Sequence, residues 1–175
     1  TFPLVKVMSY LIVQGGRKLK GRIVNQSAKN SAVAILCATP LIHGRVPLSK
    51  VPRIEEVFRI VELLKSIGVA IEDDGKGTLV VDSSAPLDLS KMDRAAACRT
   101  RVSLLLFGSL AHREKNYRLY KSGGCKLGQR TVRPHLYALE KFGVTIEALT
   151  DRFTIQHHGL RPAEIILFES SDTAT

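Results

Sequence analysis

The stretch IVELLKSIGVAIEDDGKGTLVV, residues 60–81, aligns with a second stretch, HLYALEKFGVTIEALTDRFTI, residues 135–155. Each opens with a helical pattern that stops at a glycine, Gly68 or Gly143, and continues as two short runs typical of a β-hairpin. A helix and a strand are expected before each stretch, so the repeating unit is helix, strand, helix, hairpin. Such units bury their helices together and leave their sheets outside. The sequence therefore predicts an α/β fold with helices inward and sheets outward.

The other elements follow from periodicity and from turn residues. Strands are expected at 10–13, 18–24, 45–51, 116–121 and 164–168, and hairpins pair 69–72 with 78–82 and 144–149 with 153–157. Helices are expected from the N-cap Ser27 to Pro40, from Pro52 to Gly68, over 94–110, and from Pro134 to Gly143. The final ESSDTAT would begin a third unit that is truncated, and without an initiator Met the chain is expected to be a processed or partial product.

The composition excludes several classes of protein. The 175 residues are 45% apolar and 24% charged, which is an ordinary globular balance. The net charge of +10 would suit nucleic acid, an acidic membrane surface or a multiply anionic small molecule. However, the chain has no Trp, its basic residues are dispersed, and no apolar run approaches a membrane span of about 18 residues. Neither a nucleic-acid partner nor a membrane partner is therefore expected.

Cysteine and histidine usage favours a cytoplasmic protein without a metal. Cys37, Cys98 and Cys125 lack the spacing of a disulfide framework or a zinc site, and an odd, scattered set fits a reducing compartment. The pair at 157–158 is expected to be a solvated strand end with no further ligand at a suitable spacing. The N-terminus also lacks the pattern of a signal peptide. No metal and no cofactor are predicted.

The stretch SGGCKLGQR, residues 122–130, is the first candidate site. Its three glycines indicate a loop, and Cys125 has the cations Lys126 and Arg130 close by in sequence. Neighbouring cations favour a thiolate, so this cysteine could lose or pass on a proton near neutral pH. The alternative is a surface turn with an incidental thiol.

Two helix starts form the second candidate site. Lys29 and Asn30 fall in the first turn of the helix after Ser27, where the positive end of the helix dipole attracts phosphate or carboxylate. Arg99 and Arg101 stand near the start of the helix predicted over 94–110, which is unfavourable unless an anion compensates them. For all of these residues the alternative is ordinary solvated surface charge.

These motifs together resemble the enolpyruvyl transferases. The shared features are SAKN at 27–30, an arginine at 101 and GGCxxGxR ending at 130, in that order and with similar spacing. The resemblance covers roughly residues 10–175, and family chains are more than twice as long. It implies two domains of three βαβαββ units with an active site in the cleft between them. Residues 1–24 would be strands of the partner domain, and residues 25–175 an incomplete domain of two repeats plus the start of a third.

The resemblance also implies roles for individual residues. Lys29 would contact phosphoenolpyruvate, Asn30 the amino sugar, and Arg101 the carboxylate or phosphate of phosphoenolpyruvate. Cys125 would donate a proton and would be the residue alkylated by fosfomycin, with Arg130 as a catalytic and substrate-binding arginine just after the loop.

Two further positions, His135 and Ser171, would line the nucleotide site and lie near the diphosphate. Lysine and arginine suit the nearly trianionic phosphoenolpyruvate as a point charge and a bidentate fork. The implied reaction transfers the enolpyruvyl group to the 3-hydroxyl of UDP-N-acetylglucosamine, the first step of peptidoglycan precursor synthesis. The aspartate that acts as general base comes from a C-terminal domain that this sequence does not include, so the 175 residues alone are expected to be inactive.

Three positions depart from the family pattern. Arg133 replaces an acidic residue that helps to hold uridine, and Asp172 and Thr173 replace small apolar residues near the diphosphate. The alternatives are therefore a divergent paralogue with a different acceptor, or a non-catalytic anion-binding module on the same fold.

Overall fold

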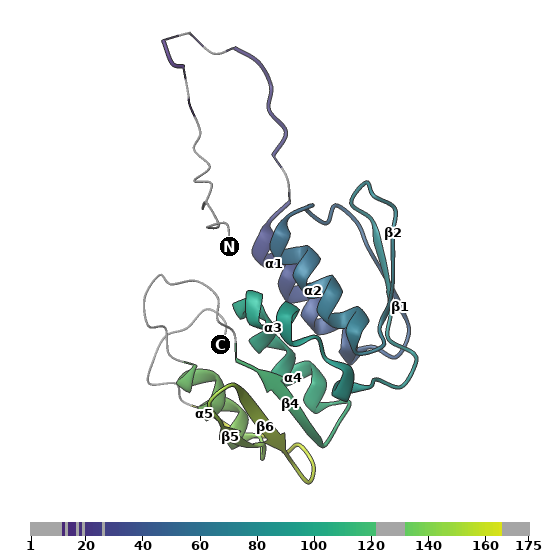
Figure 1. Ribbon diagram of the computed structural model, residues 1–175, viewed down its shortest axis with the longest axis vertical. Helices are drawn as coiled ribbons and strands as arrows, with labels where there is room; N and C mark the ends of the chain where they lie inside the picture. Colours follow the sequence, from purple (N-terminus) through teal and green to yellow (C-terminus); the bar gives the residue numbers. More distant parts are fainter. Residues whose placement is uncertain are drawn as a thin grey trace, which may run out of the picture.

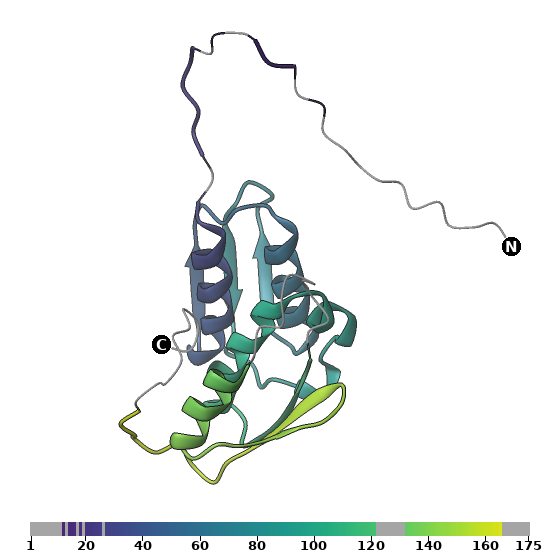
Figure 2. The same ribbon diagram turned by 90° about the vertical axis from the view of Figure 1, so that its left-hand side faces the viewer.

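Two similar α/β units make up the part of the chain that the computed structural model describes, residues 12, 14–16, 18, 20–25, 27–121 and 132–165. The first unit contains α1 (Lys29–Ala38), β1 (Arg45–Leu48), α2 (Glu55–Ser66), β2 (Ala70–Asp73) and β3 (Leu79–Asp82), with a 3₁₀ turn, η1 (Thr39–Leu41), after α1. Its antiparallel sheet has the order β1-β3-β2. The sheet flanks α1 and α2, which run side by side (Figures 1 and 2).

The second unit repeats this arrangement. A 3₁₀ turn, η2 (Leu89–Lys91), leads into α3 (Arg94–Arg99), η3 (Arg101–Leu105), α4 (Leu106–Ala111), β4 (Asn116–Tyr120), α5 (Arg133–Lys141), β5 (Thr145–Ala148) and β6 (Arg152–Gln156). Its sheet has the order β4-β6-β5 and is also antiparallel. The order matches that of the first sheet element for element, which confirms the internal repeat predicted from the sequence.

The hydrophobic core lies among the helices between the two sheets (Figure 1). Helix α2 turns an apolar stripe inward, and Gly68 ends it with a φ of +100° that favours glycine. The fully buried positions come from both units, so one core joins them: Leu36, Ile60, Leu63, Leu64, Ile67, Val81, Leu106, Phe107, Leu110, Leu119 and Ile155. The prediction of helices inward and sheets outward is confirmed.

Arg113 ties the two units together where the chain passes from one to the other. Its guanidinium donates hydrogen bonds to the carbonyl of Pro40 at 3.0 Å, to that of Ser83 at 2.9 Å and to that of Ala85 at 3.1 Å. Pro40 follows α1, and Ser83 and Ala85 follow β3. A single side chain from the end of α4 thus satisfies carbonyl groups of two segments of the first unit.

Several local predictions about the first unit were wrong. Ser27 does not cap α1, because its hydroxyl donates instead to the carbonyl of Lys50. The face of α1 turned to the core carries Val33, Leu36 and Cys37, whereas Ile35 is 49% exposed. Helix α2 begins at Glu55, three residues after the predicted start, because the chain is still extended at its N-cap, residue 54.

The second unit also differs from prediction. Residues 94–110 form three short helical pieces, because Thr100 adopts an extended conformation with a φ of −131°. His157 is buried, with only 8% of its surface exposed, and its Nε2 lies 3.2 Å from the carbonyl oxygen of Glu114. It is therefore not a solvated strand end, because this contact holds it against the turn before β4.

The strands predicted near the ends of the chain are not formed within the described residues. Residues 18 and 20–24 belong to no strand, and neither do residues 164 and 165. A strand needs a neighbour to complete its hydrogen bonds. Pairing of 1–24 with a second domain stays a prediction, and residues 166–168 lie outside the described part.

Candidate functional site

Lys29 is the first residue of α1 and points its ammonium group at a carboxylate on the neighbouring helix. Its Nζ donates to Oε2 of Glu56, in the first turn of α2, at 2.5 Å. The side chain of Lys29 is 52% exposed and that of Glu56 is 25% exposed. The ammonium is thus held at one place but remains open to solvent, where an anion could reach it.

Glu56 also contacts the break between α3 and η3. Its Oε1 accepts a hydrogen bond from the hydroxyl of Thr100 at 3.3 Å, and Thr100 is only 3% exposed. One carboxylate therefore joins the start of α1, the start of α2 and the helix break. We call Lys29, Glu56 and Thr100 the Glu56 bridge.

The break at Thr100 positions the two predicted arginines. The Thr100 hydroxyl accepts from the backbone N–H of Val102 at 3.2 Å and so caps η3. Arg99 is the last residue of α3, where a cation suits the negative end of the helix dipole, and Arg101 is the first residue of η3. The prediction that both lie near the start of one helix was wrong, because the helix is divided between them.

The charge of Arg101 acts on His135, which lies in the same unit. His135 is half-buried in the first turn of α5, directly after Pro134. Burial, and after it the positive charge of Arg101, lowers the pKa of His135 from its usual value. Both effects favour the neutral imidazole, which can accept or donate a hydrogen bond without adding charge.

Three predicted site residues thus occupy connected positions on three helical elements. The Glu56 bridge joins Lys29 to Thr100, Arg101 follows Thr100 in sequence, and the charge of Arg101 acts on His135. Asn30 follows Lys29 in α1 and is exposed. Cys125, Arg130 and Ser171 lie outside the described residues, as do the departures Asp172 and Thr173, so their positions in the site stay predictions.

Cys37 lies near the same carboxylate but is not suited to chemistry. It is 1% exposed on the inner face of α1, and its Sγ lies 3.8 Å from the carbonyl oxygen of Val102. Burial, and after it the charge of Glu56, raises the pKa of this thiol to about 12. A thiol with such a pKa stays protonated and unreactive near neutrality.

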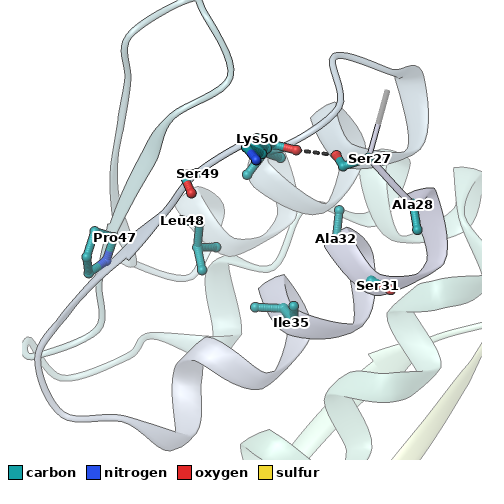
Figure 3. A pocket seen from close by; sticks show the side chains of 10 residues that line it. Ser27, Ala28, Ser31, Ala32, Ile35, Pro47, Leu48, Ser49 and Lys50 are labelled. Atoms are coloured by element: carbon teal, nitrogen blue, oxygen red, sulfur yellow. Dashed lines mark hydrogen bonds between the residues drawn. The ribbon is translucent and has the colours of Figure 1, made fainter. Parts of the chain in front are cut away.

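A groove of about 220 Å³ runs along the other side of α1 (Figure 3). The hydrogen bond from Ser27 to the Lys50 carbonyl closes one end of it. No predicted site residue from the described ranges lines this groove, whose walls are mostly small or apolar: Ser27, Ala28, Ser31, Ala32, Ile35, Pro47, Leu48, Ser49, Lys50 and Val51. Among these lining residues, Lys50 alone is a cation, whereas a phosphate ester would need several that converge.

The part of the chain that the structure describes holds no cluster of three or more His, Cys, Asp or Glu residues able to bind a metal ion. Within the same residues, no helix has the length and apolar character needed to cross a membrane.

A sequence profile for EPSP synthase (3-phosphoshikimate 1-carboxyvinyltransferase) matches residues 13–175. The chain belongs to the EPSP synthase family. A family member named UDP-N-acetylglucosamine 1-carboxyvinyltransferase from Desulfatibacillum aliphaticivorans is 36% identical over 174 residues, 96% of this chain and 40% of that protein. A protein of the same name from Bradyrhizobium diazoefficiens is 37% identical over 164 residues, 94% of this chain and 38% of its own length. The chain thus spans about 40% of the curated relatives it matches.

Solved structures of the family share the fold. The enolpyruvyl transferase NikO from Streptomyces tendae superposes with a TM-score of 0.71 at 25% identity, over 85% of this chain and 32% of NikO. EPSP synthase from Acinetobacter baumannii gives a TM-score of 0.67 at 16% identity, over 91% of this chain and 37% of that protein, and supports the fold alone. The resemblance to enolpyruvyl transferases inferred from the sequence is confirmed.

Sequence reasoning missed the two residues at the centre of the site, Glu56 and Thr100. Nothing local separates Glu56 from its neighbour Glu55, since both are acidic residues in the first turn of a helix, where they are common. Their difference appears only in the fold, because the Glu56 contacts span 27 residues to Lys29 and 44 to Thr100.

Proposed function

We propose that this chain is the phosphoenolpyruvate-binding portion of an enolpyruvyl transferase that acts on UDP-N-acetylglucosamine. In this proposal it transfers the enolpyruvyl group to the 3-hydroxyl of the amino sugar, which begins cytoplasmic synthesis of peptidoglycan precursors for the cell wall. The observation that carries the proposal is the Glu56 bridge, which holds Lys29 close to Thr100, the residue before Arg101. The charge of Arg101 in turn acts on His135. The relatives that bear the corresponding name support the choice of acceptor.

The transfer reaction requires cations around phosphoenolpyruvate, which is a small anion. Phosphoenolpyruvate carries nearly three negative charges, and it must be held while a hydroxyl adds to its enol carbon and phosphate then leaves. Lys29 offers a point charge and Arg101 a planar fork of donors, which suit the phosphate and the carboxylate. Charges placed in advance stabilise the negative charge that develops on the leaving phosphate.

The remaining roles are proposed from the sequence motif. Cys125 would deliver a proton to the methylene carbon, with Arg130 beside it, and closure of the glycine-rich segment 122–130 would exclude water. Asn30 would bind the amino sugar, His135 the nucleotide and Ser171 the diphosphate. An acidic residue on a C-terminal domain would act as general base and take the proton from the sugar hydroxyl. Without that residue, the 175 residues alone should release no phosphate.

A different acceptor alcohol is the second candidate, and Arg133 is the observation that favours it. This arginine is exposed at the first position of α5, two residues before His135. An arginine presents donors only, so it cannot replace the acidic residue that would accept hydrogen bonds from uracil.

The test uses fosfomycin and peptide mass mapping on the 175-residue chain. We expect a single adduct at Cys125, while Cys37 and Cys98 stay unmodified. Phosphoenolpyruvate should slow the adduct, because it would compete for Lys29. No adduct, or labelling at Cys98, would contradict the proposed role of the loop.

The acceptor is tested separately by NMR titration with UDP-N-acetylglucosamine, using shikimate 3-phosphate as the matched ligand. Shifts at His135 with the first ligand alone support the amino sugar. A Cys125 adduct without those shifts would assign the chain to a paralogue with another acceptor.

A further inference from the structure

Glu56 is an acidic residue in a site proposed to bind a trianion. Its Oε2 is 2.5 Å from the Lys29 ammonium, so an anion bound to Lys29 would lie only one hydrogen-bond length further away. A carboxylate at that distance repels the ligand that the lysine attracts. Its presence therefore needs a reason beyond simple anion capture.

The fold keeps this carboxylate in place. Glu56 is three-quarters buried as a side chain, and the Thr100 hydroxyl holds its second oxygen at 3.3 Å. Thr100 is itself buried and fixed by its role as the cap of η3. A carboxylate held by two partners cannot swing away when an anion arrives without breaking its hydrogen bonds to Thr100 and Lys29.

We propose that Glu56 is the fixed counter-ion of the phosphoenolpyruvate site, which orients Lys29 and lowers the affinity of the site for highly charged anions. The inference rests on the proposed function. Glu56 acts through Lys29 and is a positioning residue, not a group that touches the substrate. A site of this kind holds phosphoenolpyruvate firmly enough to orient it. It does not bind so tightly that release of the phosphate product becomes slow.

The effect of Glu56 on binding depends on the charge of the ligand. Repulsion between Glu56 and a bound anion grows in proportion to the charge of the anion. Loss of the carboxylate charge should therefore help phosphoenolpyruvate much more than pyruvate, which has a similar carboxylate skeleton but one charge. A merely structural role would change the two affinities by the same factor.

The experiment compares Glu56→Gln with Glu55→Gln in the 175-residue chain. Glu55 is in the same turn of α2, is 71% exposed and accepts from Arg59 Nε at 2.8 Å, so its variant removes an equal charge without touching the bridge. Affinities for phosphoenolpyruvate and pyruvate are measured by NMR titration of the amides in the first turn of α1. At low salt we expect Glu56→Gln to bind phosphoenolpyruvate about tenfold and pyruvate about twofold more tightly, and Glu55→Gln to change neither by more than about twofold.

A third variant separates charge from contact. Glu56→Asp keeps the negative charge but is one methylene too short to reach both partners, so its affinities should stay near those of the wild type. Weaker or equal binding by Glu56→Gln, or equal behaviour of the Asp and Gln variants, would overturn the inference while the proposed anion site survives. A wild-type chain that binds phosphoenolpyruvate no better than pyruvate would overturn the proposed function and this inference with it.

Discussion

At the scale of single residues, Cys37 shows how the charge at the site reaches the core. Its thiol is buried on α1, and both burial and the nearby Glu56 carboxylate oppose its ionisation, which raises its pKa to about 12. The unfolded chain has no such constraint and its thiol ionises near the ordinary value of 9.0. The protein should therefore be sensitive to alkaline pH through this residue.

We predict that Cys37→Ala reduces the loss of stability above pH 9. Below pH 9 the thiol is neutral in both states, so its contribution to stability is fully present. Between pH 9 and about 12 only the unfolded state ionises, and the wild type should lose up to about 1.4 kcal/mol per pH unit from this group. Urea unfolding of both proteins from pH 8 to 10.5 measures the difference in slope.

Buried Tyr117, whose pKa is also raised, is common to both proteins and cancels in this comparison. Parallel curves for the two proteins would contradict the prediction. As a second check, iodoacetamide at pH 8 should label the partly exposed Cys98 well before Cys37.

Individual site residues could be predicted from the sequence only where a motif marked them. Motifs in the sequence include Lys29, Arg101 and His135. In the structure, Glu56 connects Lys29 to Thr100, the residue before Arg101, and the charge of Arg101 acts on His135. No motif marked Glu56 or Thr100, because their importance arises from contacts between helices that are far apart in the sequence. The buried state of His157 was missed for the same reason, since its partner is a backbone carbonyl 43 residues away.

At the scale of elements, the turn between β2 and β3 is held by its own side chains and by a contact to the segment before α2. Asp74 accepts from the N–H groups of Lys76 at 2.7 Å and of Thr78 at 2.9 Å. Gly77 accepts from the Val51 N–H at 2.8 Å, which docks the turn. Two glycines of this turn, Gly75 and Gly77, have positive φ angles of +72° and +103°.

We predict that Gly77→Ala is more destabilising than Gly75→Ala. Both changes place a side chain in a left-handed conformation, at a cost of about 1 kcal/mol. At Gly77 the new Cβ would also lie 3.0 Å from the Val51 carbonyl oxygen, whereas at Gly75 it would meet open space. We expect a total loss of about 2–3 kcal/mol for Gly77→Ala from strain plus the lost docking contact.

Urea unfolding compares the two alanine variants, and the amide signal of Val51 reports the contact. Equal losses of stability, or an undisturbed Val51 signal in Gly77→Ala, would show that the turn does not depend on this approach.

Elements were predicted best where a strong pattern marked where they end. Helix α2 and both hairpins were found because an apolar stripe stops at a glycine. The division of 94–110 was missed, because the apolar residues keep a helical spacing on both sides of Thr100. The capping contacts that favour the break involve a hydroxyl and a distant carboxylate, which periodicity does not reveal.

At the scale of the whole molecule, Phe107 joins the core to the second sheet. It is 2% exposed in α4, and its ring meets that of Phe153 in β6 edge-on, with centroids 5.2 Å apart. The Tyr117 hydroxyl donates to the Phe107 carbonyl at 2.6 Å. Phe107 therefore links α4, the second sheet and the core.

We predict that Phe107→Ala lowers the free energy of unfolding by about 3–4 kcal/mol and that the two units still unfold together. The control is Phe142→Ala, at a ring 37% exposed after α5, which should cost under about 1 kcal/mol. Three of the four tyrosines, Tyr117, Tyr120 and Tyr137, lie in the second unit, so tyrosine fluorescence reports mainly that unit while circular dichroism reports both. Separate transitions by the two signals would contradict the single core.

The whole-chain architecture was predictable because the repeat appears twice in one sequence. Composition gives the net charge of +10 but does not show which cations are paired with carboxylates. Many cations are paired with carboxylates in the fold, including Lys29, Arg53, Arg59 and Arg94. The absence of a nucleic-acid partner stays a prediction, for which weak, salt-insensitive retention on duplex DNA is the expected result.

The hydrogen bonds of Arg113 have a consequence for the exposed segment 84–86, which links the two units. This segment is open to a protease, since it is exposed to solvent between the two units. A cut between Ser84 and Ala85 would leave the carbonyls of Ser83 and Ala85 on separate pieces, both still hydrogen-bonded to the Arg113 guanidinium. The nicked protein would travel through a sizing column as an intact particle, and the break would become visible only once the pieces were unfolded.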